Sequence, residues 1–566
     1  MKGMQADLSG TAAGPERFRF APPYRLPSWP FVAPPELDEP RRIARHPIVI
    51  VGAGPAGLTL ACDLARRGVR ALLLDEDDTV GVRGASSRGI CYAQKTLEIF
   101  ARLGIYQRVA DKGITWSLGR TFSNADEVYS FNLQTDNLSA QPPFINLQQF
   151  YVEWFLVDRI LELGLTDLRW KSRLARIAPL ADGVRIVVET PAGSYEIEAD
   201  HLVDATGAHS PIREQLGLDA HASRSTDRWC ISDVRFEKPL PTERWTWVDA
   251  PFNEGRAVWQ HLMGDGVWRI DYQMAEDCDS AEISKPEVVG ARLREQLGPG
   301  VEFEFVWIGP YGYRDHLLDR FRHGRVFFIG DAAHVVSPFG ARGGNSGIQD
   351  AVNLGWKLAL VTQGRAGAAL LDSYDAERQP AAAENLKVTS RSARFLAPRS
   401  DAERTIRSAV LALASRHAFA RTLVNTGRMS VANDYPAGPQ LPAGGRSLPN
   451  LPLRWQDGEA TTLMQLLGEG SEWLALIFAP TGAQAAAAPQ ATAGLPLRLV
   501  AVGGRSGLPT LQPDAALERL LAHPAPGSVC LIRPDAYRAA LLDTPDAAAI
   551  GAALRRALAL DDQAGA

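Results

Sequence analysis

The sequence predicts an α/β protein with one mainly parallel sheet, one antiparallel sheet and a small α/β domain at its C-terminal end. Three observations predict this class. A glycine-rich turn separates a short apolar strand from a helix in the stretch VIVGAGPAGLTLA. Short segments of alternating polarity fill residues 225–310, and a proline- and glycine-rich linker at 433–453 precedes further apolar strands. The length of 566 residues also exceeds what a single hydrophobic core spans, which is roughly 300 residues.

The composition excludes several classes of protein. The formal net charge of -5 leaves no basic field of the kind that a general nucleic-acid binder needs. No apolar run approaches the roughly 20 residues of a membrane helix, and the N-terminus lacks the apolar core of a secretory signal. The five cysteines form neither a CxxC pair nor a metal-binding spacing, so no metal is expected. We therefore expect a reduced, cytoplasmic protein that binds neither nucleic acid nor membrane, with a proline-rich N-terminal arm over residues 1–45.

The first turn fits the pattern GxGxxG with Gly52, Gly54 and Gly57. In this pattern the first glycine allows the tight turn, the second lets the backbone approach a pyrophosphate, and the third lets the helix pack closely on the strand. Pro55 occupies the first helical position, and the N–H groups and positive dipole end of the helix can bind phosphate. Asp75, at the end of the second strand, can accept hydrogen bonds from a ribose. The motif predicts a bound dinucleotide but does not by itself separate NAD from FAD.

A second set of features lies much later in the chain. The stretch RVFFIGD is predicted to be a buried strand that carries Asp331 to its C-terminal end, where doubly wound sheets bind ligands. Apolar residues recur at helical spacing from Ile348 onward, so Gly343, Gly344 and Asn345 are expected at a helix N-terminus. A long cofactor would join the two motifs, with its pyrophosphate at the first turn and its far end near Asp331.

The late stretch resembles the motif GDAAH…P-x-G-G-Q-G-x-N-x-G-x-x-D-A-x-N-L-x-W-K-L of the group A FAD-dependent aromatic hydroxylases, the p-hydroxybenzoate hydroxylase-like flavoproteins. The match is long and without gaps, and it includes Gly330, Asp331, His334, Pro338, Gly340, Gly343, Asn345, Gly347, Asp350, Asn353, Trp356 and Lys357. The resemblance covers about residues 46–560. It implies an α/β fold with an FAD-binding Rossmann-type domain, an interleaved antiparallel-sheet substrate domain and a C-terminal thioredoxin-like domain.

The resemblance also implies the domain boundaries. The FAD-binding domain would be discontinuous, over 46–224 and 311–400, with the substrate-binding sheet domain over 225–310. A helical connector over 401–435 would lead to the thioredoxin-like domain over 436–566, in which Arg533, Pro534 and Asp535 match the RPD turn of the phenol and polyketide hydroxylase branch. Because this domain has no CxxC, we interpret it as structural or as a contact for a homodimer rather than as a redox unit.

The resemblance further implies which residues hold FAD. Asp331 would bind the ribityl chain, and the backbone N–H groups of Gly344 and Asn345 would face the flavin pyrimidine oxygens. Arg88 occupies the position of an arginine that contacts the flavin chain, and Gln149 begins the Q-x-x-x-E helix that reaches FAD. The predicted cofactor-binding residues are Gly52, Gly54, Pro55, Ala56, Gly57, Asp75, Glu76, Arg88, Gln149, Gly330, Asp331, Gly343, Gly344 and Asn345.

Two positions depart from the family pattern. Arg342 stands where the family most often has glutamine, and with Pro338 we predict it as catalytic. Beside the flavin, Arg342 would stabilise the reduced ring or meet an acidic substrate; the alternative is that it points to solvent. Thr206, in DATGAHS, takes the aspartate position of a motif credited with FAD and NAD(P)H binding. Asp204 lies two residues earlier on the same strand face and could partly compensate, because threonine carries no charge.

Residues 225–310 contain aromatic-rich strands such as RWTWVDAP, RAVWQHLM and GVWRIDYQM. In the family this antiparallel sheet covers an aromatic substrate. We predict Gln260, Arg269, Tyr272 and Tyr311 as substrate contacts. Alternation alone does not decide which sheet face they occupy, because a shift of register by one residue exchanges the faces.

The resemblance implies that NADPH or NADH reduces FAD and that O2 then gives a flavin C4a-hydroperoxide, which hydroxylates a phenolic or other aromatic substrate. The partners would be a small aromatic molecule, O2 and NAD(P)H. The tasks of the chain would be to orient the ring, exclude water and activate the phenol. Two alternatives stay open: an FAD-dependent oxidoreductase without oxygen insertion, which Thr206 motivates, and a flavin-binding protein without catalysis.

Overall fold

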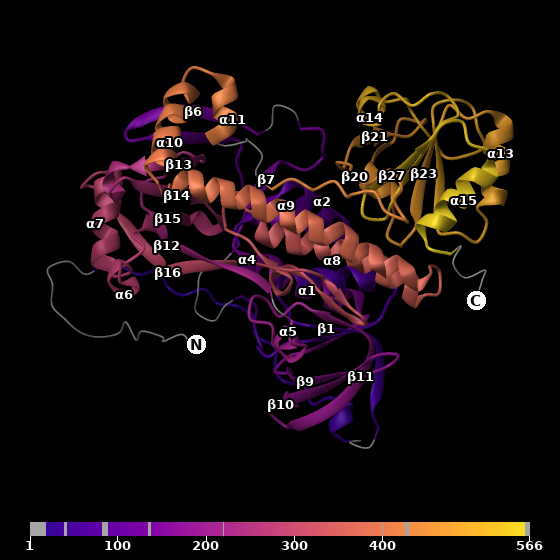
Figure 1. Ribbon diagram of the computed structural model, residues 1–566, viewed down its shortest axis with the longest axis horizontal. Helices are drawn as coiled ribbons and strands as arrows, with labels where there is room; N and C mark the ends of the chain where they lie inside the picture. Colours follow the sequence, from indigo (N-terminus) through magenta and orange to yellow (C-terminus); the bar gives the residue numbers. More distant parts are fainter. Residues whose placement is uncertain are drawn as a thin grey trace.

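The computed structural model describes residues 18–38, 42–81, 89–133, 137–218, 220–398, 400–424 and 430–560. Three large sheets dominate this part of the chain. In Figure 1 the first sheet lies at the bottom, the second at the left and the C-terminal sheet at the upper right. The predicted α/β class is confirmed.

The first sheet is the parallel sheet that the glycine-rich turn predicts. Its order is β17-β18-β11-β1-β2-β8, with β10 and β9 continuing from β11. Strands β18, β11, β1, β2 and β8 run parallel, and Ile48, Ile50 and Leu73 are fully buried between the layers. The bounds are β1(Ala44–Val51), β2(Ala71–Leu74), β8(Thr166–Arg169), β9(Arg173–Pro179), β10(Val184–Thr190), β11(Gly193–Asp204), β17(Arg322–His323) and β18(Val326–Phe328).

Helices α1(Pro55–Arg66) and α4(Gln149–Leu163) pack on the strands of this sheet, and α8(Gly343–Thr362) packs on α1. Helix α1 follows the first turn and also packs against α4. The predicted late helix is therefore α8, and it begins at Gly343 as expected. Helix α2(Gln94–Leu103) packs on α8, and α3(Tyr106–Lys112) follows it.

The second sheet is antiparallel over most of its width. Its order is β19-β16-β12-β15-β14-β13-β5-β6. Strands β5 and β6 come from the range expected in the FAD-binding domain, and β13 pairs with β5 in parallel. Local alternation does not reveal such a long-range pairing. The bounds are β5(Leu118–Ser123), β6(Asp126–Asn132), β12(Ala220–Phe236), β13(Arg244–Ala250), β14(Arg256–Leu262), β15(Trp268–Met274), β16(Phe303–Leu318) and β19(His334–Val335).

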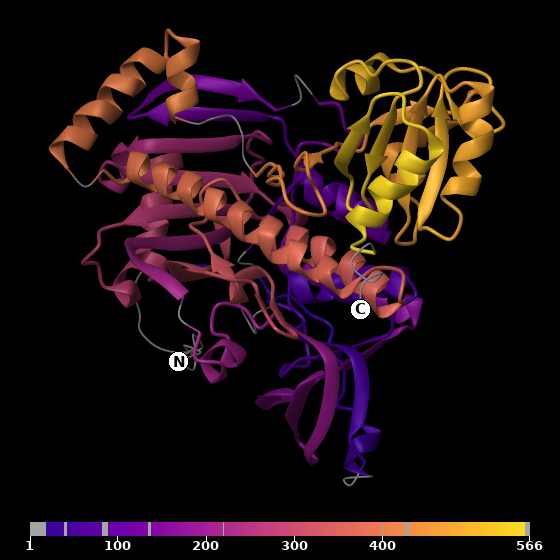
Figure 2. The ribbon, with the colours of Figure 1, turned by 45° about the vertical axis from the view of Figure 1, so that its right-hand side comes forward.

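The two faces of the second sheet are covered differently. One face packs on α7(Pro286–Leu297), whose Val289 and Leu293 join a core with Val258 and Ile270. The other face meets Phe339 and the C-terminal end of α9(Asp372–Leu396). Figure 2 shows this long helix crossing the sheet toward the C-terminal domain.

The C-terminal sheet confirms the thioredoxin-like prediction. Its order is β20-β27-β26-β23-β24-β25, with β23 and β24 parallel to each other, β26 antiparallel to β23, and β27 antiparallel to β26. Before it, α10(Asp401–Ala414) and α11(Ala418–Val424) lie in the range expected for a helical connector and pack on Tyr129 of β6. The bounds are β20(Arg446–Ser447), β23(Trp473–Phe478), α13(Gly482–Ala491), β24(Leu497–Val502), β25(Thr510–Leu511), α14(Ala515–Leu520), β26(Val529–Ile532), β27(Tyr537–Leu542) and α15(Ala547–Ala557).

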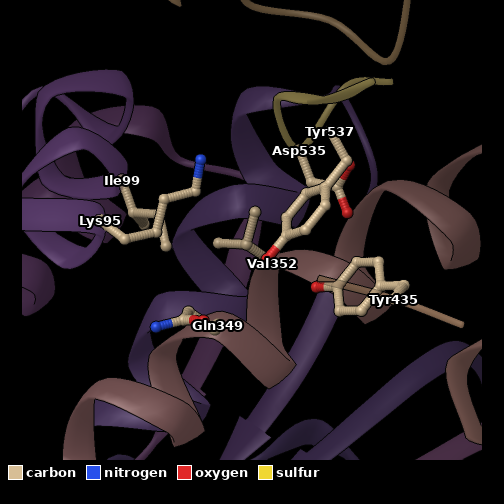
Figure 3. Close-up of a pocket in the computed structure, with 7 residues that line it drawn as sticks. All are labelled: Lys95, Ile99, Gln349, Val352, Tyr435, Asp535 and Tyr537. Carbon is tan, nitrogen blue, oxygen red and sulfur yellow. The ribbon is translucent and has the colours of Figure 1, made fainter. Parts of the chain in front are cut away.

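A buried ionic network joins the C-terminal domain to α8 and α9. Arg533 donates to both carboxylate oxygens of Glu377, at 2.7 and 2.9 Å, and it also pairs with Asp535 at 2.6 Å. Lys357 of α8 lies 2.8 Å from Glu377. The RPD turn thus serves as a docking element. Beside it lies a small open crevice, where Figure 3 shows the side chains of Lys95, Ile99, Gln349, Val352, Tyr435, Asp535 and Tyr537.

The described part of the N-terminal arm, residues 18–38, packs along the protein and links the first two sheets. Near its start, Ala21 donates a backbone hydrogen bond to the carbonyl of Phe305 in β16. Further on, Trp29 stacks on Trp170 with ring centroids 4.8 Å apart, and Glu36 accepts two hydrogen bonds from Arg169. Across the described ranges, a membrane-spanning length of apolar helix is not found.

Candidate active site

Two helix N-termini meet above the carboxyl ends of the parallel strands. Helix α1 starts after β1, and α8 starts after the short strand β19 that follows β18. They approach through glycines: a Cβ atom at Gly347 would lie 3.0 Å from the Cα of Gly330, and one at Gly330 would lie 3.2 Å from the Cβ of Ala56. The open N–H groups of both first turns therefore face one region, as the sequence predicts.

The first turn has the geometry that a pyrophosphate requires. Gly52 has φ +107°, and a Cβ there would lie 2.4 Å from the carbonyl oxygen of Ala205. A Cβ at Gly57 would lie 1.9 Å from the oxygen of Gly52, so this glycine is required by close packing. At Gly54 a Cβ would meet nothing within 4 Å, which leaves space before the first turn of α1. Pro55 follows at the first helical position, so the turn fits an anionic ligand.

The acidic residues after β2 behave differently from each other. Asp75 accepts hydrogen bonds from the backbone N–H groups of Ala53, at 2.5 Å, and Asp77, at 2.8 Å. Burial raises the pKa of Asp75. Asp75 thus fixes the glycine-rich turn through Ala53. Glu76 is exposed beside it.

Asp331 lies exposed at the end of β18, in a single turn of 3-10 helix over Gly330–Ala332. The turn is held from below by Asp350 of α8, which accepts from the Gly330 N–H at 3.1 Å and contacts His334 Nε2 at 2.6 Å. Arg378 of α9 donates to the same carboxylate at 2.7 Å. Burial alone would raise the pKa of Asp350, but Arg378 and His334 lower it to about 2. Asp350 therefore holds the turn that carries Asp331.

The N-terminus of α8 is fixed by a side chain and leaves its backbone open. Asn345 donates to the carbonyls of Cys91 and Ala341, at 2.9 and 2.6 Å, and accepts from the Ala93 N–H and the Thr96 hydroxyl. Its side chain is thus structural. Gly344 is exposed, and a Cβ there would meet nothing within 4 Å.

Gln149 and Glu153 of α4 hold the ends of the segment that contains Arg88. Gln149 accepts from the Gly89 N–H at 2.9 Å and donates to Glu153 at 2.7 Å, and Glu153 accepts from the Gly81 N–H at 2.6 Å. Burial raises the pKa of Glu153 to about 7. Arg88 itself lies outside the described residues, so its predicted flavin contact stays a prediction.

The loop before α8 buries Arg342. This side chain is 5% exposed and donates to Asn385 of α9 at 2.7 Å, so the alternative in which it points to solvent is wrong. Burial lowers the pKa of its guanidinium. Pro338 is partly exposed in the same loop and accepts from the backbone N–H of Ala341, which has φ +55°. The loop therefore presents a partly exposed proline and a buried cation beside the N-terminus of α8.

Thr206 and Asp204 form hydrogen bonds with each other. The Thr206 hydroxyl donates to Asp204 Oδ1 at 2.7 Å, and the Thr206 N–H donates to the same oxygen at 2.9 Å. Ser210 donates to the other carboxylate oxygen. Asp204 is 0% exposed, so it stabilises the turn and presents no oxygen to a ligand.

The face of the second sheet that meets α9 is aromatic. Trp229 stacks on Trp259 with centroids 4.4 Å apart, and Trp259 meets Phe339 edge-on at 4.9 Å. Tyr311 packs against the same cluster. Arg269 shares this face and donates to both oxygens of Asp233, at 2.8 Å each.

The structure does not bring all four predicted substrate residues together. Gln260 and Tyr272 lie on the opposite face, toward α7, where Gln296 donates to Gln260 at 2.8 Å and accepts from the Tyr272 hydroxyl at 2.9 Å. The register of β14 and β15 puts Trp259 opposite Asp271 on the aromatic side. Two residues on this side, His261 and Asp271, were not predicted. Strand alternation could have identified them, because each lies two positions from a residue of the aromatic face. The sequence alone, however, does not show which strand face is the aromatic one.

The arrangement fits a long anionic cofactor that runs from Gly54 to the start of α8, with an aromatic face beside its far end. A family model described as an FAD binding domain matches residues 45–389. The chain is 30% identical over 533 residues to 6-methylpretetramide 4-monooxygenase of Streptomyces rimosus, covering 90% of this chain and 91% of that protein. It is also 30% identical to anhydrotetracycline monooxygenase of the same organism, over 73% of this chain and 82% of the relative.

Solved structures show the same fold. The flavin-dependent monooxygenase PieE, in complex with FAD and substrate, superposes with a TM-score of 0.77 at 22% identity, covering 91% of this chain and 99% of PieE. Aklavinone-11 hydroxylase, in a ternary complex with FAD and aklavinone, gives a TM-score of 0.73 at 24% identity, covering 92% and 100%. The family model spans more than half of the chain. This chain therefore belongs to the FAD-dependent aromatic hydroxylases built on that domain.

Proposed function

We propose that this flavoprotein monooxygenase uses NADPH or NADH and O2 to hydroxylate an aromatic ring that carries a hydroxyl group. The observation that supports this proposal best is the junction of the open N-terminus of α8 with the aromatic face of Trp229, Trp259 and Phe339. A ring bound against that face would lie next to the far end of the cofactor. FAD supplies the electron transfer and the activation of oxygen.

The roles of the chain follow from its geometry. The first turn of α1 would bind the pyrophosphate, and Asp331 would bind the ribityl hydroxyls. The N–H groups of Gly344 and Asn345, with the helix dipole, would stabilise negative charge on the reduced ring. Arg342 would add a cation from the same loop, because its guanidinium is buried there against the neutral amide of Asn385.

The aromatic face formed by Trp229, Trp259 and Phe339 has two further proposed roles. Flat, rigid side chains orient a planar substrate by stacking and edge contacts. They also exclude water, which would otherwise divert the activated oxygen. Helices α7 and α9 cover the two faces of the second sheet and would hold the aromatic face in place.

The source of the reductant supports a cytoplasmic location for the proposed reaction. The five cysteines are unpaired and NAD(P)H is a cytoplasmic reductant, which supports a cytoplasmic reaction. Exposed apolar side chains on α10 and α11, among them Ile406 and Phe419, are consistent with a contact between two copies of the chain.

A stopped-flow experiment tests the proposal. The purified flavoprotein is mixed anaerobically with NADPH or NADH, with and without a panel of phenolic acids and polycyclic phenols, and flavin bleaching is followed. We expect one class of phenol to accelerate bleaching by at least about tenfold. Bleaching that no phenol accelerates, together with no hydroxylated product in air, would refute the proposal.

A second function is favoured by one observation, the Thr206–Asp204 pair. Because neither side chain offers a charge to a nicotinamide nucleotide, electrons could come from the substrate itself, as in a dehydrogenase. The discriminating result is bleaching by substrate without NAD(P)H. Substituting Thr206 with Asp is expected to speed reduction by NAD(P)H if this pair limits it.

A further inference from the structure

Three arginines lie together where helices α1 and α2 meet the C-terminal domain. Arg66 is the last residue of α1, Arg67 caps that helix, and Arg102 lies in the last turn of α2. The Arg102 guanidinium donates to the carbonyl of Pro534 in the C-terminal domain. Gln363, just beyond α8, donates to the carbonyl of Arg67 at 2.9 Å, so these residues lie at the end of α8 opposite to the proposed flavin position. We call Arg66, Arg67 and Arg102 the arginine cluster.

Within this cluster, only Arg67 has a carboxylate partner in the part of the chain that the structure describes. Its Nε and Nη2 atoms donate to the two oxygens of Asp63, at 2.8 and 3.0 Å. Its Nη1 atom donates to the carbonyl of Gly470 in the C-terminal domain at 2.8 Å. Asp63 therefore balances the charge of Arg67, while Arg66 and Arg102 have no paired anion among the described residues.

The edge of Arg102 that suits an anion is buried and unpaired. The residue is 9% exposed, and its Nε and Nη2 atoms have no hydrogen-bond partner among the described residues. These two atoms form the edge with which Arg67 holds Asp63, and it matches two oxygens of a carboxylate or phosphate. Nη1 of Arg66 is a third buried donor without a partner in the same ranges. Because buried donors are normally paired, these atoms point to a ligand that accepts from them.

The charge of the cluster selects the kind of ligand. Burial lowers the pKa of Arg102 to about 9, with contributions from Arg67 and Arg66, and burial also lowers the pKa of Arg66. Asp535, a further carboxylate near Arg102, is held by Arg533 at 3.0 and 2.6 Å. A water molecule would accept hydrogen bonds but leave the two guanidinium charges unbalanced, which is costly in a buried site. A doubly charged oxyanion would balance both.

The small crevice beside the RPD turn lies next to the cluster. Lys95 and Ile99 of α2 line it, and Arg102 follows Ile99 by about one helical turn. Figure 3 shows Asp535 on the other side of this crevice, and the neighbouring Pro534 is the residue whose carbonyl accepts from Arg102. A small ion can approach the cluster from this side. Because Arg102 is buried, an inorganic ion suits the position better than a nucleotide.

We propose that Arg66 and Arg102 bind one inorganic oxyanion, phosphate or sulfate, in the interface between the FAD-binding domain and the C-terminal domain. The Nε and Nη2 atoms of Arg102 donate to two oxygens of the ion, and Nη1 of Arg66 donates to a third. No bond of the ion is broken. Since Arg67 and Arg102 also hold the carbonyls of Gly470 and Pro534, the ion strengthens the docking of the C-terminal domain.

The test uses the FAD-loaded full chain and requires neither flavin reduction nor oxygen insertion. Thermal unfolding is followed by flavin fluorescence in phosphate, sulfate or chloride at equal ionic strength, and equilibrium dialysis with radiolabelled phosphate counts the bound ions. We expect phosphate and sulfate to raise the unfolding temperature until the effect saturates, with one phosphate bound at the cluster in each chain. An unfolding temperature that is the same in phosphate and chloride, with no phosphate retained in dialysis, would overturn the proposal.

Variants locate the site. Arg102→Gln should weaken phosphate binding at least about tenfold, and Arg102→Lys, which keeps the charge but loses the two-donor edge, should weaken it less. The partly exposed Arg66→Gln should also weaken binding, which keeps the test valid if Arg102→Gln does not fold. The matched control is the exposed Arg70→Gln, which removes the same charge and should bind phosphate as wild type does.

Two further outcomes would count against the site. Phosphate binding by folded Arg102→Gln and Arg66→Gln that equals wild type would place the ion elsewhere and overturn the proposal. Adenosine 2′-phosphate serves as the nucleotide probe, and we expect it to cause no shift of the unfolding temperature that depends on Arg102. A shift that Arg102→Gln abolishes would show that the site takes a nucleotide phosphate and would contradict the assignment of an inorganic ion. FAD content and circular dichroism establish that each variant folds.

Discussion

At the scale of single residues, Asp331 carries the most specific prediction about the cofactor. Its carboxylate is exposed at the end of β18 while the turn beneath it is fixed by Asp350. Substituting Asp331 with Asn keeps the shape and removes the charge, so affinity for FAD should fall about tenfold to a hundredfold. Flavin fluorescence on dilution measures this. The exposed Asp319→Asn is the control, and equal FAD retention in both variants would contradict the assignment.

Glu153 provides a residue-scale prediction about pH. Burial raises its pKa from 4.5 to about 7, partly offset by hydrogen bonds from Gln149 and the Gly81 N–H. A carboxyl group whose folded pKa is raised stabilises the protein below its unfolded pKa, and this contribution is lost as pH rises through about 7. Glu153→Gln, which mimics the protonated form, should remove about 2–3 kcal/mol of pH dependence between about pH 5 and pH 8 in urea unfolding. An unchanged pH dependence would show that Glu153 is not the responsible group.

At the scale of elements, two glycines at the start of α1 are expected to have different roles, one in stability and one in cofactor binding. A Cβ at Gly57 would collide with the oxygen of Gly52, whereas a Cβ at Gly54 would enter open space. Gly57→Ala should therefore lower the free energy of unfolding by about 2 kcal/mol or more. Gly54→Ala should leave apoprotein stability within about 0.5 kcal/mol and weaken FAD binding. Urea unfolding of both apoproteins with FAD titration checks the pair. Equal losses of stability would contradict the geometry.

The same elements show what the sequence can predict. Both helix N-termini were predictable from sequence because the local backbone there requires particular residues. Gly52 and Gly57 are needed for the tight turn and close packing before α1, and a glycine-rich turn precedes Ile348 in α8. The faces of β14 and β15 were not, because they depend on pairings between distant segments. Gln260 and Tyr272 therefore seemed equivalent to Arg269, although they point toward α7. The burial of Arg342 against Asn385 has the same origin, since α9 must first be placed across the sheet.

At the scale of the whole molecule, the C-terminal domain acts as a clamp on α8 and α9. Burial alone would raise the pKa of Glu377, but Arg533 and Lys357 lower it to about 2. The contribution of this depressed carboxylate is present above its unfolded pKa of 4.5 and is lost as pH falls toward about 2. The RPD motif thus has a physical role that requires no redox chemistry.

Arg533→Met tests the clamp. Removing the Arg533 guanidinium leaves the buried Glu377 carboxylate without its main cation. The free energy of unfolding should therefore fall by about 3–5 kcal/mol. The matched control is the exposed Arg519→Met on α14, which should change stability by less than about 0.5 kcal/mol. Thermal unfolding monitored by flavin fluorescence provides the comparison. Equal stability of the two variants would show that the ionic network does not hold the domains.

The central claim is that electrons from a nicotinamide nucleotide and one atom of O2 reach an aromatic ring held between the start of α8 and the Trp229–Trp259 face. The most direct measurement is mass spectrometry of the product formed under isotopically labelled dioxygen, with NADPH and the phenol that best accelerates flavin reduction. We expect a product that carries one labelled oxygen atom on its ring. A product with no label, or NADPH oxidation that yields only hydrogen peroxide with every phenol, would contradict it.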